Sequence, residues 1–166
     1  MKTIAVFLSL SYLSLLIEST WCVFCDLYFL HIDPLPALIC WISLNEDFWP
    51  GTLAVTICGL LASLFSCLDF FLFPVAYLIG FFTVYFIRIN VLELSRLQAY
   101  LITGFISIEI LVIQLAGSGT PELLWPWGII QAVLNFAIAP TAFWMCDRCL
   151  ALVASLVAKF SHEKGN

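Results

Sequence analysis

Charge is scarce in this sequence of 166 residues. Only 10% of the residues are charged, whereas 63% are hydrophobic. A soluble domain has about 25% charged residues and about 45–50% apolar ones. So few charged side chains could not cover the surface of a water-soluble fold. The composition therefore indicates an all-α membrane protein, built from apolar helices as a single integral membrane domain over residues 1–166.

Basic residues are especially few, and the long apolar stretches contain none of them. The six basic residues are Lys2, Arg88, Arg96, Arg148, Lys159 and Lys164. Lys and Arg that flank membrane spans favour the cytoplasmic side. A topology with six spans and a cytoplasmic N-terminus puts all six on that side, together with the C-terminus. The outer loops of this topology, near 22–33, 66–69 and 117–122, contain no Lys or Arg.

Motifs of soluble enzymes and nucleic-acid binders are also missing. The sequence has no P-loop, no glycine-rich dinucleotide loop and no basic patch for nucleic acid. It has no Ser/His/Asp, Cys/His or HExxH arrangement, and no metal-ligand spacing connects His31 with His162. We therefore expect no catalytic residue, no cofactor, no metal site and no nucleic-acid partner.

Six apolar stretches approach the length of about 20 residues that a spanning helix needs. They cover residues 3–20, 28–44, 50–67, 70–87, 97–116 and 125–147. The second stretch is the least regular, because Asp33, Pro34 and Pro36 interrupt it. Its uninterrupted part is short for a full crossing, so this segment is expected to tilt or to begin as a buried loop.

The last apolar stretch continues to Phe160 and is too long for one crossing. As a single helix it would measure roughly 50 Å, against a hydrocarbon core of about 30 Å. Asp147 and Arg148 therefore mark the predicted exit from the membrane. Residues 149–160 are predicted to continue as a helix at the cytoplasmic surface.

Seven cysteines include two CxxC pairs, Cys22/Cys25 and Cys146/Cys149. Four such thiols suggest a zinc site, but the predicted topology places the two pairs on opposite faces of the membrane. The outer pair alone resembles the DsbB-type quinone-linked disulfide oxidoreductases. That family needs a second cysteine pair in its second outer loop, and residues 117–122 contain no Cys. A thiol oxidoreductase remains one alternative.

Two carboxylates fall within predicted spans, Glu18 and Glu109. An ionisable residue inside the membrane is a functional-site hypothesis, here a proton or cation path. The other interpretation is a hydrogen-bonded Glu that locks helices together through Gln114, Gln131 or Asn135. Gln131 and Asn135 are four residues apart and share a helix face, which favours contacts between helices.

Small residues and proline predict features of helix packing. Gly59 and Ser63 form a small-xxx-small step that lets another helix approach closely. Pro140 is expected to kink the last span, because its ring displaces the carbonyl four residues back.

The order of these motifs resembles the rod shape-determining protein MreD family. The resemblance rests on residues 16–20 (LIEST), on 33–36 (DPLP), on 59–66 (GLLASLFS), on Pro74, and on the series Gln131, Asn135, Pro140, Asp147 and Arg148. The family has an Asp four residues after the glycine, and Ser63 replaces it here. Any role that needs a carboxylate at that position is therefore in doubt.

This resemblance implies a six-helix fold with a central cavity, akin to the S-components of energy-coupling-factor transporters, in a bacterial inner membrane. It implies a non-catalytic role in cell-wall elongation, scaffolding peptidoglycan synthesis and regulating cell shape. The implied partners are an MreC-like protein and, through it, MreB filaments, a RodA-type glycosyltransferase and a class B penicillin-binding protein, besides the lipid bilayer. A vitamin-binding transporter subunit of the same fold is a further alternative. The candidate structural or interaction residues are Glu18, Gly59, Ser63, Pro74, Glu109, Gln131, Asn135, Pro140, Asp147 and Arg148.

Overall fold

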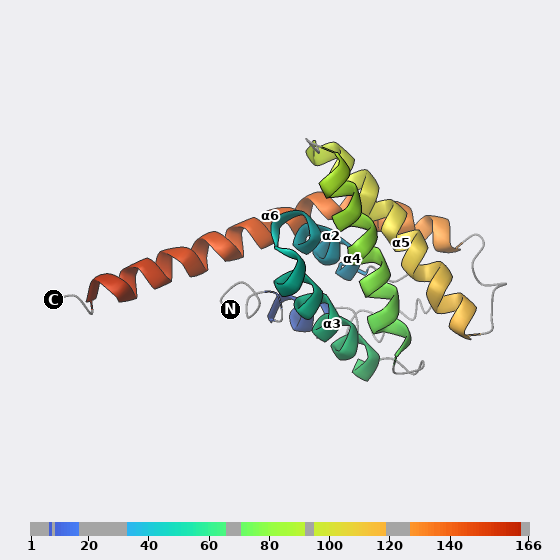
Figure 1. The fold of residues 1–166 in the computed structure, drawn as a ribbon, viewed down its shortest axis with the longest axis horizontal. Helices are drawn as coiled ribbons and strands as arrows, with labels where there is room; N and C mark the ends of the chain where they lie inside the picture. Colours follow the sequence, from blue (N-terminus) through green and yellow to red (C-terminus); the bar gives the residue numbers. More distant parts are fainter. Residues whose placement is uncertain are drawn as a thin grey trace.

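The computed structural model describes residues 7, 9–16, 33–65, 71–91, 95–118 and 127–163. Regular structure in these residues is entirely helical. After a helical segment at 9–16, the helices are α2 (Leu35–Asn45), α3 (Phe48–Phe65), α4 (Leu72–Asn90), α5 (Arg96–Ser118) and α6 (Trp127–Glu163). They form one bundle, and the C-terminal part of α6 projects from it (Figure 1).

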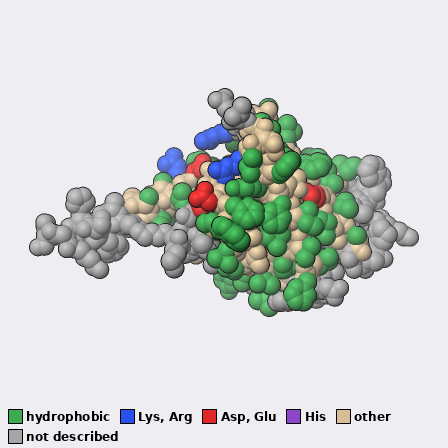
Figure 2. Space-filling model, in the orientation of Figure 1, with side chains coloured by type: hydrophobic (Ala, Val, Ile, Leu, Met, Phe, Trp, Pro, Cys, Tyr) green, Lys and Arg blue, Asp and Glu red, His purple; other side chains and the backbone are tan. Residues whose placement is uncertain are grey.

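Three helices are long and apolar enough to cross a membrane. Their apolar stretches are Leu72–Asn90 in α4, Arg96–Ile113 in α5 and Ile129–Ser155 in α6. The apolar parts of α2 and α3 are shorter. The space-filling view shows a surface on which apolar side chains predominate (Figure 2). The protein is therefore helical and of membrane character, as its composition predicts.

The bounds of α3, α4 and α5 lie close to the predicted stretches 50–67, 70–87 and 97–116, whereas α2 begins later than the predicted start at residue 28 and α6 continues beyond the predicted end at residue 147. Helix α3 begins at Phe48, two residues before Pro50. Proline is tolerated in the first turn of a helix because the N–H that it lacks would have no partner there. The sequence interpretation placed the start at Pro50 itself, so the difference reflects this tolerance.

Helix α2 lies at the centre of the bundle, although it has only 11 residues. It packs against α3, α4, α5 and α6. Nine of its residues are buried, from Leu35 to Ser43. The helix coincides with the uninterrupted part of the second predicted stretch, and residues 33–34 before it are not helical. A helix this short and this enclosed meets other helices on all sides.

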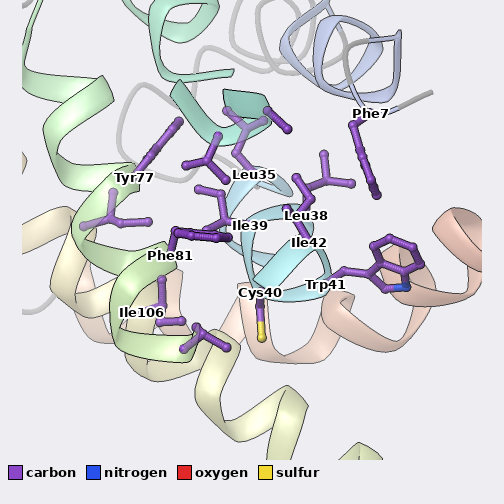
Figure 3. Close-up of a cluster of buried hydrophobic side chains, with 14 of the residues drawn as sticks. Phe7, Leu35, Leu38, Ile39, Cys40, Trp41, Ile42, Tyr77, Phe81 and Ile106 are labelled. Atoms are coloured by element: carbon purple, nitrogen blue, oxygen red, sulfur yellow. The ribbon is translucent and has the colours of Figure 1, made fainter. Parts of the chain in front are cut away.

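The side chains of α2 hold together the main apolar core. Figure 3 shows them extending toward the surrounding helices, with Tyr77 and Phe81 of α4 on one side and Phe7 and Trp41 together on another. The Phe7 and Trp41 ring centroids are 5.0 Å apart. Side chains from several helices thus meet around α2, and its position depends on all of them.

Helices α3 and α4 approach each other most closely at Gly59. A Cβ atom at Gly59 would lie 2.5 Å from the Cα of Pro74 and 2.8 Å from its nitrogen. One turn later, the buried Ser63 hydroxyl donates a hydrogen bond of 2.8 Å to the Gly59 carbonyl. Gly59 therefore lies at a close helix–helix contact, the role that small residues favour, while the Ser63 hydroxyl bonds within its own helix.

Helix α6 is continuous over 37 residues, from Trp127 to Glu163. It passes through Pro140, and it does not break at Asp147 or Arg148. At 1.5 Å per residue its length is about 55 Å, which exceeds the hydrocarbon core of a bilayer. Residues 149–160, predicted as a surface helix, are thus an extension of the last membrane helix. Their position at the cytoplasmic surface stays a prediction.

The Gly59 contact leads to a test of stability. Gly59→Ala should lower the free energy of unfolding by about 1–3 kcal/mol, because the new methyl group would collide with the backbone of Pro74. The matched control is Gly104→Ala, where a Cβ would lie 3.5 Å from the Cβ of Phe136 in ordinary contact. Unfolding in detergent, followed by circular dichroism, measures both. Equal stability of the two variants would contradict the close contact.

Candidate functional site

Buried polar groups gather at the start of α2, in a cluster formed by Asp33, Asn135, Ser107 and Thr103. The Leu35 N–H donates to Asp33 Oδ1 at 2.9 Å, and the Asp33 N–H donates to Asn135 Oδ1 at 3.3 Å. Asn135 Nδ2 in turn donates to Ser107 Oγ at 3.1 Å. All four side chains of the cluster are buried. One amide on α6 thereby joins the start of α2 to α5.

The cluster provides hydrogen-bond partners for backbone groups that would have none in the apolar interior of a membrane. The first N–H groups of a helix have no partner within it, and an unpaired one is costly in an apolar medium. Asp33 stands one residue before the N-cap Pro34 and accepts from the first of these groups, the Leu35 N–H. At the end of this series of hydrogen bonds, Ser107 donates to the Thr103 carbonyl at 2.8 Å. The arrangement is chemically suited to joining helices.

Asn135 thus joins different helices. This is the role expected from the sequence, because Asn135 and Gln131 share one face of α6. Gln131 lies one turn earlier on α6 and is half-buried. The sequence interpretation missed Asp33 and treated it only as an interruption of a span. An Asp-Pro pair directly before an apolar helix is typical of a capped helix start, and this pattern could have identified it.

A second cluster lies at the end of α2 and includes Arg88. Arg88 Nη1 donates to the carbonyls of Ser43 at 3.1 Å and of Glu46 at 2.7 Å. The last carbonyls of a helix lack partners within it and carry partial negative charge, so a cation there is stabilising. Sequence analysis used Arg88 only to orient the chain. In the structure it also caps the central helix.

Helix α6 reaches the same end of α2 through Asp147. The Trp41 indole N–H donates to Asp147 Oδ1 at 2.9 Å. Arg96 Nη2 lies 4.0 Å from Asp147 Oδ2, but both side chains are largely exposed, so this ion pair contributes little stability. The Arg148 guanidinium lies 5.6 Å from the centre of the Trp144 ring. These contacts join α2, α5 and α6.

Charged residues from the α2–α3 turn, the end of α4, the start of α5 and the middle of α6 therefore share one edge of the bundle. Figure 2 shows basic and acidic side chains gathered beside the base of the projecting end of α6. We call this region the charged edge; it consists of Glu46, Asp47, Arg88, Arg96, Asp147 and Arg148. The predicted topology places these residues together on the cytoplasmic side. Which side of a membrane the edge faces stays a prediction.

Glu109 lies apart from both clusters, between α5 and α4. Its Oε1 accepts a hydrogen bond of 3.2 Å from the Thr83 hydroxyl of α4. Its Oε2 is buried and has no hydrogen-bond partner within the described part of the chain. The bond to Thr83 supports the interpretation of a carboxyl group that links helices. The linked helix is α4, and the expected amide Asn135 bonds Asp33 and Ser107 instead.

Other predicted residues have architectural positions or lie outside the described residues. Gly59 and Pro74 meet at the α3–α4 contact, Ser63 is buried one turn after Gly59, and Pro140 is exposed on α6. Glu18 and the pair Cys22/Cys25 lie outside the described residues. Cys146 is buried and Cys149 half-buried, and both thiols are free. Among residues that the structure describes, no group of three or more His, Cys, Asp or Glu could hold a metal ion.

No family model, curated protein or solved structure matches the chain. The function must therefore be argued from the sequence pattern and the geometry of these clusters.

The cluster at the start of α2 is tested by Asn135→Leu. This change should cost about 1–3 kcal/mol of unfolding free energy, because it leaves the Asp33 N–H buried without its acceptor. Ser107→Ala removes one hydrogen bond between helices, from Asn135, and one within α5, to the Thr103 carbonyl. Loss of the interhelical bond should cost about 0.6 kcal/mol, the average for such bonds in membrane proteins. Chemical unfolding in mixed micelles measures both values. A cost for Asn135→Leu no larger than that for Ser107→Ala would argue against the cap.

The charged edge should make stability depend on pH through Glu46, which lies in the turn after α2. Partial burial raises the pKa of this carboxyl above its ordinary value of 4.5, and the neighbouring charge of Asp47 adds to the shift while Arg88 opposes it. A raised pKa means that the folded state binds the proton more tightly than the unfolded state. Stability should therefore decrease as pH rises through the window that starts near 4.5.

The difference between the wild type and Glu46→Gln isolates this contribution. The variant should match the wild type at low pH and become the more stable of the two as pH approaches about 7, because it carries no charge to desolvate. Asp47→Asn serves as the control and should reduce the pH dependence only in part. A difference that stays constant over this range would refute the shift.

Proposed function

We propose that this chain is a six-span, non-catalytic assembly protein that acts through the membrane-embedded sides of its helices. The main support for the proposal is that polar and apolar side chains occupy different places in the bundle. The polar side chains of the two α2 clusters bond to other helices of the same chain. The outward surfaces of α4, α5 and α6 present large apolar side chains, such as Phe86, Phe105 and Val133.

Such outward surfaces suit contacts within the membrane. Helices in lipid associate through close packing and a few interhelical hydrogen bonds. Burial of apolar surface alone gives little preference for a helix over lipid as the neighbour. The long apolar helices therefore offer several lateral faces to partner helices. The catalytic groups that an enzyme would need are missing from the sequence pattern.

The specific role that we propose is membership of the cell-wall elongation machinery of a rod-shaped bacterium, in its inner membrane and with both termini in the cytoplasm. Support comes from the order of motifs that resemble the MreD family. Among them, Gly59 and Pro74 contact each other, and Asn135 links α2 with α5 and α6. Residues that carry the resemblance thus have packing roles, as expected of an assembly protein. The proposed fold is akin to a transporter S-component.

Depletion of the protein from its rod-shaped host tests this role. Cells should become round, and a tagged full-length chain should co-purify an MreC-like protein. Microscopy of depleted cells and mass spectrometry of the purified complex measure these outcomes. Normal rods together with recovery of the tagged chain without such a partner would contradict the proposal.

Complementation separates the alternatives. A chain in which Cys22→Ser and Cys25→Ser are combined should restore rod shape fully, because the proposed role has no thiol step. Failure of this variant, at normal abundance, would favour the thiol oxidoreductase. A vitamin that stays bound through purification of the wild type would instead favour the transporter subunit.

A further inference from the structure

An aromatic groove lies between the start of α3 and the second half of α4. Its volume is about 740 Å³, and it is open to the outside over much of its length. We call it the aromatic groove; its lining includes Phe48, Phe82, Thr83, Tyr85, Phe86 and Ile89. The Phe48 ring stacks on Phe82 at 5.9 Å and meets Tyr85 edge-on at 5.5 Å. Phe86 is 70% exposed and Ile89 65% exposed, so the groove opens on the lateral surface of the bundle.

The groove begins at the charged edge. Arg88 stands between two lining residues, Ile87 and Ile89, and its guanidinium lies 5.9 Å from the centre of the Tyr85 ring. Its Nη1 is held by the carbonyls of Ser43 and Glu46. A guanidinium fixed in this way suits a phosphate, because its planar set of donors matches phosphate oxygens.

Two acidic residues lie in the turn that leads to the groove. Glu46 and Asp47 directly precede Phe48, which lines the groove. Arg88 lies beside the Tyr85 ring of the lining and bonds the Glu46 carbonyl, so a fixed cation and the turn that carries two carboxylates lie close to the groove. This pattern complements a headgroup that carries both a negative and a positive charge, and it disfavours a headgroup with net negative charge.

The position of the groove supplies the third argument. Helix α4 is long and apolar enough to span a membrane, so its lateral surface at this depth adjoins the acyl chains of lipid. Arg88 follows the apolar part of α4, which is where a residue at headgroup level is expected in a spanning helix. The volume is within the range of about 300–1,000 Å³ that is usual for small-ligand sites lined mainly by apolar and aromatic side chains.

We propose that the aromatic groove binds a zwitterionic phospholipid of the phosphatidylethanolamine type. One acyl chain lies along Phe82 and Phe86, the phosphate is held by Arg88, and the ammonium group lies beside Glu46 and Asp47. This site does not depend on the proposed cell-wall role, and its loss leaves that proposal standing.

Native mass spectrometry of the full-length, delipidated protein in detergent tests the site. The probes are phosphatidylethanolamine, phosphatidylglycerol and diacylglycerol with identical acyl chains. One equivalent of phosphatidylethanolamine should bind several-fold more tightly than either of the others. Tighter binding of phosphatidylglycerol, or equal binding of diacylglycerol, would overturn the assignment of the headgroup site.

Substitutions of exposed residues should leave the fold intact, so their effect on lipid binding can be read directly. Phe86→Ala should weaken binding of phosphatidylethanolamine by about 5-fold or more, close to 1 kcal/mol. The matched control is Phe105→Ala, because Phe105 is 61% exposed on α5 and does not line the groove. Asp47→Asn should reduce the preference for phosphatidylethanolamine over phosphatidylglycerol. Equal affinity of the wild type and the Phe86 and Phe105 variants would overturn the proposal.

A photo-reactive phenylalanine analogue at position 86 tests the occupant in intact membranes. An adduct with the mass of a phospholipid would support the proposal. An adduct with another protein, or a cross-linked dimer of this chain, would overturn it in favour of a partner helix or a second copy.

Discussion

The central physical constraint in this structure is the need to satisfy both ends of a short helix inside an apolar bundle. Helix α2 has 11 residues and is enclosed by its neighbours. Its start is buried, so its first N–H groups require partners from the protein, and its last carbonyls face Arg88 where the chain reaches the exposed Asn45. Asp33 meets this need at the start, supported by Asn135, and Arg88 meets it at the end.

This constraint explains why polar residues occur at these depths in an otherwise apolar chain. Asn135 comes from α6, Ser107 from α5 and Arg88 from α4, and each bonds directly or through one residue to an end of α2. Apolar packing around Tyr77 and Phe81 then fills the space between these polar ends. Polar bonds thus determine where the helices meet, while the apolar side chains determine how closely they pack. Glu109 with Thr83 is a separate link of the same kind between α4 and α5.

Much of the architecture could be predicted from the sequence, because apolar length and the positions of Lys and Arg depend on local composition. The spans later seen as α4 and α5, the short second helix and the small residues at Gly59 and Ser63 follow from such local patterns. The clusters at α2 could not be predicted in the same way. Residues 33 and 135 are 102 positions apart, and nothing in either segment indicates that they meet. Likewise, the local sequence of Arg88 is compatible with a simple flanking charge, and only tertiary structure reveals the carbonyls that it caps.

Helix α6 gives this arrangement a mechanical property. It carries Asn135, which bonds beside the first residues of α2, and Asp147, which accepts from Trp41 near the last ones. These two points are 12 residues apart on one continuous helix, or about 18 Å. The same helix then extends beyond the bundle (Figure 1). A load on this projecting end would reach the attachment point at Asp147 first and then, through the helix that contains Pro140, the one at Asn135, so the exterior of the molecule is linked to its buried helix α2.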